Sequence, residues 1–141
     1  MNKSERERNE FQYPMTQKSA CNAMIVILIS ALLLHFSILT QLIDYGNVWG
    51  GKLANEMEMY VFETISICFN AFLLFTILQK AGYIKQHFSN KVVSIVLWSF
   101  VFVFGINTIG NLFANNLFEQ IAGTAVTLIS SILCFVIVRD K

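Results

Sequence analysis

The stretch VVSIVLWSFVFVFGINTIGNLFANNLF, residues 92–118, contains no Asp, Glu, Lys or Arg. A helix needs about 20 largely apolar residues to cross the roughly 30 Å hydrocarbon core of a bilayer. Further uncharged runs cover residues 19–43, 64–79 and 120–138. The run at 64–79 reaches the length of a span only when residues 59–63 are added, which takes the carboxyl group of Glu63 into the membrane. The sequence therefore predicts four transmembrane helices.

Length and composition leave room for these spans and little else. Of the 141 residues, 55% are hydrophobic, 13% are charged and 1 is proline. We place the spans at residues 23–43, 57–78, 92–114 and 121–138. The sequence predicts an all-α integral membrane protein, an antiparallel four-helix transmembrane bundle formed by residues 21–141. Residues 1–20 are expected to be a retained cytoplasmic tail, because the apolar run after them is too long for a signal peptide.

The basic residues lie on one side of the predicted spans. Lys and Arg together number 10, and all except Lys52 fall before span one, between spans two and three, or after span four. Cytoplasmic segments carry an excess of Lys and Arg, so this distribution places both termini in the cytoplasm of a multi-pass cell-membrane protein. Basic patches with interleaved aromatic residues do not occur, so nucleic acid is not expected as a partner.

Two ionisable residues fall inside the predicted spans, His35 in the first and Glu63 in the second. Such residues are costly in hydrocarbon and normally face the bundle interior or a water-filled cavity. At about 1.5 Å per residue from the outer end of each span, Glu63 lies roughly 9 Å deep and His35 roughly 12 Å deep. Asn107 and Asn111 of span three fall in the same layer. We therefore expect a polar intramembrane cluster of these four side chains in the outer half of the bundle.

The role of this cluster has alternative interpretations. Polar side chains on membrane helices usually join helices through hydrogen bonds, so Asn107, Asn111 and a His35–Glu63 pair could be purely structural. Alternatively, the pair could form a proton, cation or ligand site, as perturbed titratable groups often do. A third possibility is that His35 and Glu63 do not touch.

The loop DYGNVWGGKLANE, residues 44–56, is the longest external segment and the one rich in glycine. Tyr45 and Trp49 suit the membrane–water interface. Gly50 and Gly51 permit positive φ and a tight reversal of the chain. Trp49, Gly50 and Gly51 are therefore candidate contacts from this loop to the cluster.

The fourth span has two faces of different character. Gly123, Thr127 and Ser131 form a small face at helical spacing, which predicts close packing against another span, most simply span three across the short hairpin. The side expected to face lipid consists of Val126, Ile129, Leu133 and Ile137.

The remaining sequence offers no catalytic or metal-binding motif. It lacks a nucleophile motif, a His-Glu-x-x-His set and a phosphate cradle, so no catalytic residue, metal or cofactor is expected. The cysteines have no C-x-x-C partner and are expected to be packing residues (Cys21, Cys68 and Cys134). The acids between spans are expected to be solvated rim residues (Asp44, Glu56, Glu58 and Glu119). Asn115 or Asn116 is the expected cap of span four.

Two segments, WGGKLANEMEMYVFETISICFN at residues 49–70 and GINTIGNLFANNLFE at residues 105–119, resemble patterns in small bacterial four-span integral membrane proteins to which no activity is assigned. In those proteins a Trp-Gly-Gly loop precedes a helix bearing Phe-Glu, and a Gly-Asn turn leads into the final span. The resemblance extends from the end of span one to Arg139 and implies the four-helix fold. The motif positions are Trp49, Gly50, Gly51, Glu63, Asn107, Gly110 and Asn111.

Three classes of function follow from these observations. The first, favoured by the lack of catalytic motifs, is a non-enzymatic membrane protein whose partners are the lipid bilayer and a second copy of the chain or another membrane protein. The second is a small proton-linked or solute transporter or channel that uses Glu63 and His35. The third is a membrane enzyme acting on a lipid-like substrate with these two residues as acid and base. A cavity lined by Glu63 would favour the second or third, and a filled bundle the first.

Overall fold

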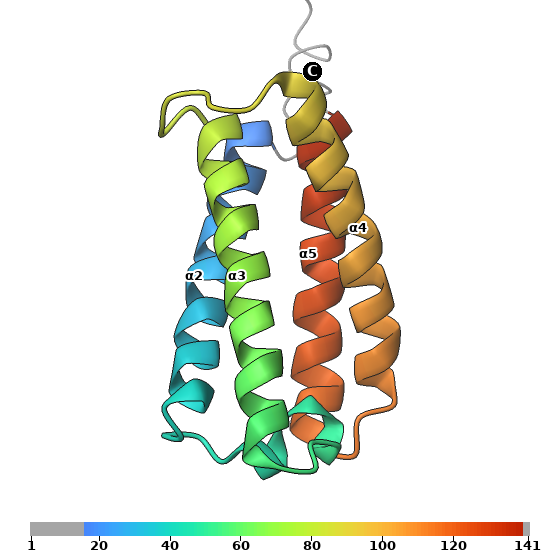
Figure 1. The fold of residues 1–141 in the computed structure, drawn as a ribbon. Helices are drawn as coiled ribbons and strands as arrows, with labels where there is room; N and C mark the ends of the chain where they lie inside the picture. The colour runs from blue at the N-terminus through green and yellow to red at the C-terminus, as the bar shows by residue number, and fades with distance from the viewer. Residues whose placement is uncertain (1–15, 140–141) are drawn as a thin grey trace, which may run out of the picture.

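The computed structural model of the chain describes residues 16–139, apart from the side chain of Asn47. Within them, antiparallel helices run the length of the molecule (Figure 1): α2 (Gln17–Leu39), α3 (Glu56–Lys80), α4 (Asn90–Leu112) and α5 (Thr124–Arg139). A π-helical turn, η3 (Glu119–Gly123), leads into α5. Each of the 4 spans is long and apolar enough to cross a membrane, which confirms the predicted all-α bundle. The predicted tail, residues 1–20, lies mostly outside the described residues.

Side-chain caps decide where the helices begin. The Thr16 hydroxyl accepts from the N–H of Ser19 at 3.3 Å, so α2 starts earlier than the predicted residue 23. Asn55 and Ser89 cap α3 and α4 in the same way. At its other end α2 stops before the predicted residue 43, because the chain leaves the helix at Gln41, which has a left-handed φ of 57°.

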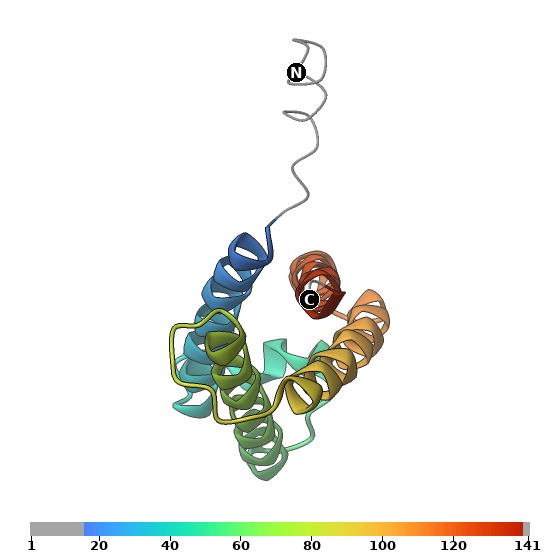
Figure 2. The same cartoon turned by 90° about the horizontal axis from the view of Figure 1, so that it is seen from above.

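The helices form two hairpins, α2–α3 and α4–α5, which meet mainly along α2 and α5 (Figure 2). Contacts between α3 and α4 are few. One hydrophobic core joins the hairpins in the half of the bundle nearest the α3–α4 connection. Its buried members are Ala20, Cys21, Met24, Leu28, Leu73, Ile77, Val93, Leu97, Phe100, Leu133, Cys134 and Ile137. Cys21 and Cys134 are thus packing residues as expected, whereas Cys68 is exposed.

The small face of α5 packs against α4, as predicted. The hydroxyl oxygens of Thr127 and Thr108 lie 3.0 Å apart, and the Ser131 hydroxyl donates to the carbonyl of Val101 at 2.9 Å. These contacts need short side chains on α5, because each reaches a group on or close to the neighbouring backbone.

The prediction of a lipid-facing side on α5 is correct for only half of the residues it named. Val126 and Ile129 are exposed, but Leu133 and Ile137 are buried in the core. The prediction was wrong for these two residues because α5 packs against α2 as well as α4, and the last turns of α5 therefore have two covered sides.

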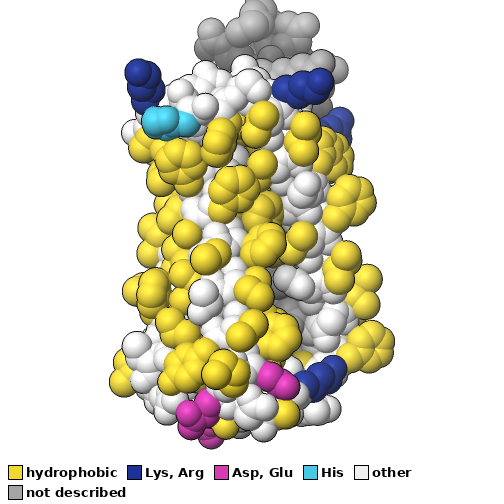
Figure 3. Space-filling view, in the orientation of Figure 1, with side chains coloured by type: hydrophobic (Ala, Val, Ile, Leu, Met, Phe, Trp, Pro, Cys, Tyr) yellow, Lys and Arg dark blue, Asp and Glu magenta, His cyan; other side chains and the backbone are white. Residues whose placement is uncertain are grey.

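Charged side chains gather at the two ends of the bundle, with an apolar band between them (Figure 3). The basic end carries Lys18, Lys80, Lys85, Lys91 and Arg139. The acidic end carries Asp44, Glu56, Glu58 and Glu119, together with Lys52. The band between them exposes many Phe, Ile, Leu and Val side chains. Lipid is the environment that such a surface favours, so the chain is a multi-pass membrane protein in contact with the bilayer.

Candidate functional site

His35 and Glu63 form a pair in the half of the bundle nearer the acidic end. His35 Nδ1 lies 2.7 Å from Glu63 Oε2. The Glu63 side chain is 0% exposed and the His35 side chain is 19% exposed. The pair forms because α2 and α3 are antiparallel neighbours and place these residues at similar depths. The possibility that the two residues do not touch is therefore excluded.

Trp49 forms a hydrogen bond to the second oxygen of the Glu63 carboxyl group. Its indole N–H donates to Oε1 at 2.6 Å, and its ring packs against Phe62 with centroids 5.1 Å apart. The chain turns sharply to reach this position, since Trp49, Gly50 and Gly51 have φ values of 56°, 69° and 67°. The left-handed conformation costs a non-glycine residue about 1–2 kcal/mol. The segment of residues 44–55, which we call the Trp49 loop, is thus held against the bundle in a strained conformation.

Gly50 ties the Trp49 loop to the second hairpin. Its N–H donates to Oε2 of Glu119 at 2.7 Å, and its carbonyl accepts from Nδ2 of Asn115 at 2.9 Å. Gly50 is buried, and a Cβ at this position would lie 3.6 Å from the Cα of Ala114. The loop therefore bridges the acidic end, from Glu63 on α3 to Glu119 in η3.

The four residues of the expected cluster fall into two groups that share Trp49 as a neighbour. Asn107 and Asn111 line a groove of about 200 Å³, whose walls also include Trp49, Gly50, Lys52, Gly110, Ala114 and Glu119. Asn107 is exposed there, while Asn111 also reaches α5, with Nδ2 3.4 Å from the Thr127 hydroxyl. The hydrogen bonds to the Glu63 carboxyl group come from His35 and Trp49 instead.

The surroundings of Glu63 are suited to holding a proton and to fixing a loop. An indole N–H can only donate, so Oε1 of Glu63 is an acceptor in this contact. His35 Nδ1 can donate to a carboxylate or accept from a carboxylic acid, and either arrangement places one proton between the two residues. Within residues 16–139, no group of 3 or more His, Cys, Asp or Glu side chains could hold a metal ion.

Fold and site together define a small four-span α-helical membrane protein with a buried His–Glu pair. Comparisons of the chain with protein-family models, with curated proteins and with solved structures give no match.

Two partners of the Trp49 loop differ from their expected roles. Glu119 is expected to be a solvated rim residue, but it is partly buried and accepts from Gly50. Of the two candidate caps, Asn116 accepts from the N–H of Phe118 at 2.9 Å, whereas Asn115 reaches the carbonyl of Gly50. The sequence does show several polar residues close together between α4 and the start of α5. It does not show which segment of the chain they bind.

Proposed function

We propose that the protein is non-enzymatic, that it acts through what it binds in the bilayer, and that Glu63 anchors its Trp49 loop. The observation that carries this proposal is the fully buried carboxyl group of Glu63, with one oxygen against His35 and the other against Trp49. A general acid or base must come within about 3 Å of the group with which it exchanges a proton. The groove is lined by residues of the Trp49 loop and of the second hairpin, and Glu63 is not one of its lining residues, which favours an anchoring role for Glu63 over catalysis.

We infer further that the acidic end faces the outside of the cell membrane and the basic end the cytoplasm. Lys85 in the α3–α4 connection, Lys80 and Lys91 at the adjoining helix ends, and Arg139 at the end of α5 support this orientation. Cytoplasmic segments are enriched in Lys and Arg. Trp49, at 37% exposure, then lies at the outer membrane–water interface, where tryptophan is common. The groove would accordingly be reached from the outer leaflet.

Variants that remove the Glu63 carboxyl group test the proposal that it holds the Trp49 loop in place. The chain has 2 tryptophans, so Trp98→Phe leaves Trp49 as the only one, whose fluorescence can be excited selectively. On this background Glu63→Leu removes both acceptors, and aqueous acrylamide should quench Trp49 more strongly as the loop loosens. Glu63→Gln keeps an oxygen for the indole N–H and should behave like its parent. Equal quenching in all three proteins would overturn the anchoring role.

A proton-linked transporter or channel is the second candidate, and the contact between His35 and Glu63 favours it. A proton can pass between His35 Nδ1 and Glu63 Oε2, which lie 2.7 Å apart. Liposomes containing a pH-sensitive dye distinguish this candidate. If protons cross through the parent protein and Glu63→Gln abolishes this flux, the result supports transport. If no protons cross through the parent protein, the transporter and channel candidates are excluded.

A further inference from the structure

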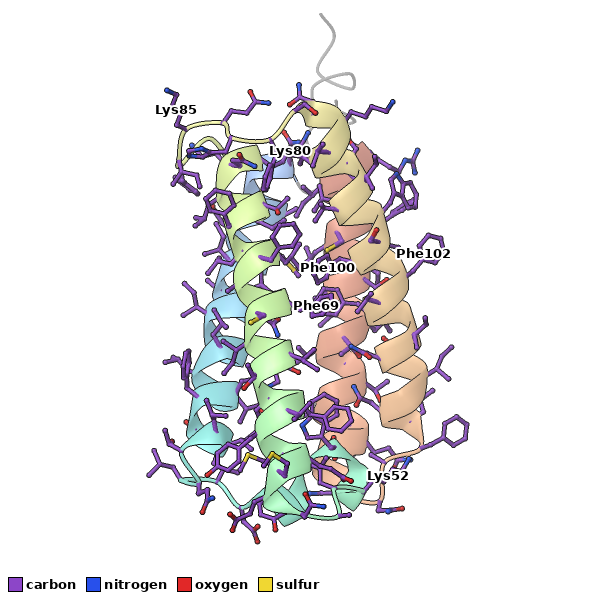
Figure 4. All side chains as sticks on the ribbon, in the orientation of Figure 1. Lys52, Phe69, Lys80, Lys85, Phe100 and Phe102 are labelled. Carbon is purple, nitrogen blue, oxygen red and sulfur yellow. The ribbon has the colours of Figure 1, made fainter. Side chains whose placement is uncertain are left out.

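The seam between α3 and α4 is closed by aromatic rings toward the basic end. Phe69 on α3 and Phe100 on α4 have ring centroids 6.1 Å apart, and Phe88, just before α4, packs on Phe72 and Phe75 at 6.1 and 5.7 Å. Figure 4 shows Phe69 and Phe100 in the space between the two helices. The groove lies beyond this closure, toward the acidic end.

The open part of the seam ends beside a charged side chain. Figure 3 shows a hollow between α3 and α4 that descends through the apolar surface toward a basic side chain, labelled Lys52 in Figure 4. A molecule in this hollow would therefore have apolar surface along its length and polar groups at one end, which is the chemical pattern of a membrane lipid.

The groove contains a cation and an anion that are not paired with each other. Lys52 and Glu119 both line it, and no ion pair joins them within the residues that the structure describes. Glu119 uses Oε2 to accept from Gly50, which leaves Oε1 as an acceptor. The amides of Asn107 and Asn111 add both donors and acceptors. A complementary ligand carries a negative and a positive group a short distance apart.

We propose that this groove binds the headgroup of a phospholipid of the phosphoethanolamine type, with its phosphate at Lys52 and its ammonium group at Glu119. Lysine binds phosphate as a compact positive charge. The volume of about 200 Å³ admits a headgroup and not a whole lipid, so the acyl chains lie outside it, along the seam up to Phe69. The inference rests on the proposed function and names the ligand class that the protein binds.

The same groove discriminates against the other common headgroups. A primary ammonium donates hydrogen bonds to a carboxylate, whereas the quaternary ammonium of phosphatidylcholine has no N–H to donate. Phosphatidylglycerol brings a phosphate without a cation and adds a negative charge beside Glu119. One charge-assisted hydrogen bond at a partly exposed site predicts a preference of about threefold to tenfold for phosphatidylethanolamine.

Quenching of Trp49 by brominated lipids measures this preference directly. The full chain carrying Trp98→Phe is placed in phosphatidylcholine bilayers that contain equal fractions of brominated phosphatidylethanolamine, phosphatidylcholine or phosphatidylglycerol. We expect the brominated phosphatidylethanolamine to quench Trp49 most strongly. Glu119→Gln should reduce the difference between the lipids while keeping an oxygen for Gly50. Lys52→Gln should instead weaken quenching by all three lipids, because each of them carries a phosphate. Lys85→Gln, at the basic end, is the matched control and should leave the preference unchanged.

The outcomes separate the two proposals. Equal quenching by the three lipids, a preference for phosphatidylglycerol or phosphatidylcholine, or a preference that survives Glu119→Gln would each overturn the lipid site. If Glu63→Leu still loosens the Trp49 loop in the acrylamide experiment, the anchoring role stands despite such a result. A loop that does not respond to Glu63→Leu overturns the anchoring role, whatever the lipid preference.

Discussion

The indole N–H of Trp49 donates to Oε1 of Glu63 at 2.6 Å, joining a surface loop to a fully buried carboxyl group. A hydrogen bond contributes about 0.5–1.5 kcal/mol between neutral groups and about 1.5–3 kcal/mol to a charged one. Either contribution is comparable to the roughly 1–2 kcal/mol cost of a left-handed backbone at Trp49. The conformation of the Trp49 loop therefore depends on one side chain inside the bundle, which in turn contacts His35 on the neighbouring helix.

Removing the carboxyl group should destabilise the bundle more than replacing it with an amide. Glu63→Leu leaves His35 Nδ1 and the Trp49 indole N–H without their hydrogen-bond partner, which predicts a loss of about 2 kcal/mol in the free energy of unfolding. Glu63→Gln keeps an acceptor of the same shape and should cost less than about 1 kcal/mol. Unfolding in mixed detergent micelles measures both, with exposed Glu56→Gln as the control. A Glu63→Gln variant as unstable as Glu63→Leu would contradict this account.

A larger side chain in place of Gly123 should push α4 away from η3 and α5. A Cβ added at Gly123 would lie 3.0 Å from Nδ2 of Asn111, while one added at Gly105 on α4 would meet nothing within 4 Å. Gly123→Leu should therefore cost about 1–3 kcal/mol through overpacking. Gly105→Leu should be neutral or stabilising, since leucine favours helix over glycine. Similar melting temperatures for the two variants would rule out tight packing at Gly123.

A residue other than glycine at position 50 should disturb the Trp49 loop specifically. Gly50 and Gly82 both have left-handed φ, 69° and 77°, so alanine strains the backbone at either site by about 1–2 kcal/mol. Only Gly50 binds the second hairpin, through Glu119 and Asn115. Acrylamide should reach Trp49 more easily in Gly50→Ala than in Gly82→Ala. Equal access in the two variants would show that the loop does not depend on this contact.

The orientation in the membrane is tested with reporter fusions at three positions. Fusions at Lys85 and Lys141 should report the cytoplasmic side, and a fusion at Lys52 should report the opposite side, because basic loops stay in the cytoplasm. The Lys85 fusion is an internal control for the Lys141 result. The same side for Lys52 and Lys141 would contradict the orientation.

The fold could be predicted from the sequence because it depends on local patterns. Uncharged runs of membrane-spanning length appear directly in a sequence, and short connections make neighbouring spans antiparallel. The contact of His35 with Glu63 could also be anticipated, since depth in the membrane follows from position along a helix. The contact of Gly123, Thr127 and Ser131 with α4 followed from their spacing and size in the same way.

The contacts of the Trp49 loop could not be predicted, because they join residues far apart in the chain. Gly50 meets Glu119 and Asn115 only because consecutive left-handed residues turn the loop back across the acidic end. Glycine in a sequence indicates that such a turn is permitted, but it does not indicate the direction of the turn. A left-handed φ at Trp49 could not be expected, because tryptophan disfavours that conformation. The burial of Leu133 likewise depends on how one hairpin packs on the other.

The proton on the Trp49 indole nitrogen tests the central claim most directly, namely that Glu63 anchors the loop. In a ¹H–¹⁵N spectrum of the chain in lipid nanodiscs, with Trp98→Phe assigning the signals, a short hydrogen bond to a buried carboxyl group should shift this proton downfield and slow its exchange with water. Glu63→Leu should abolish both effects and Glu63→Gln should retain the protection. A Trp49 indole proton that exchanges as fast as that of an exposed tryptophan, and that does not respond to Glu63→Leu, would contradict the account.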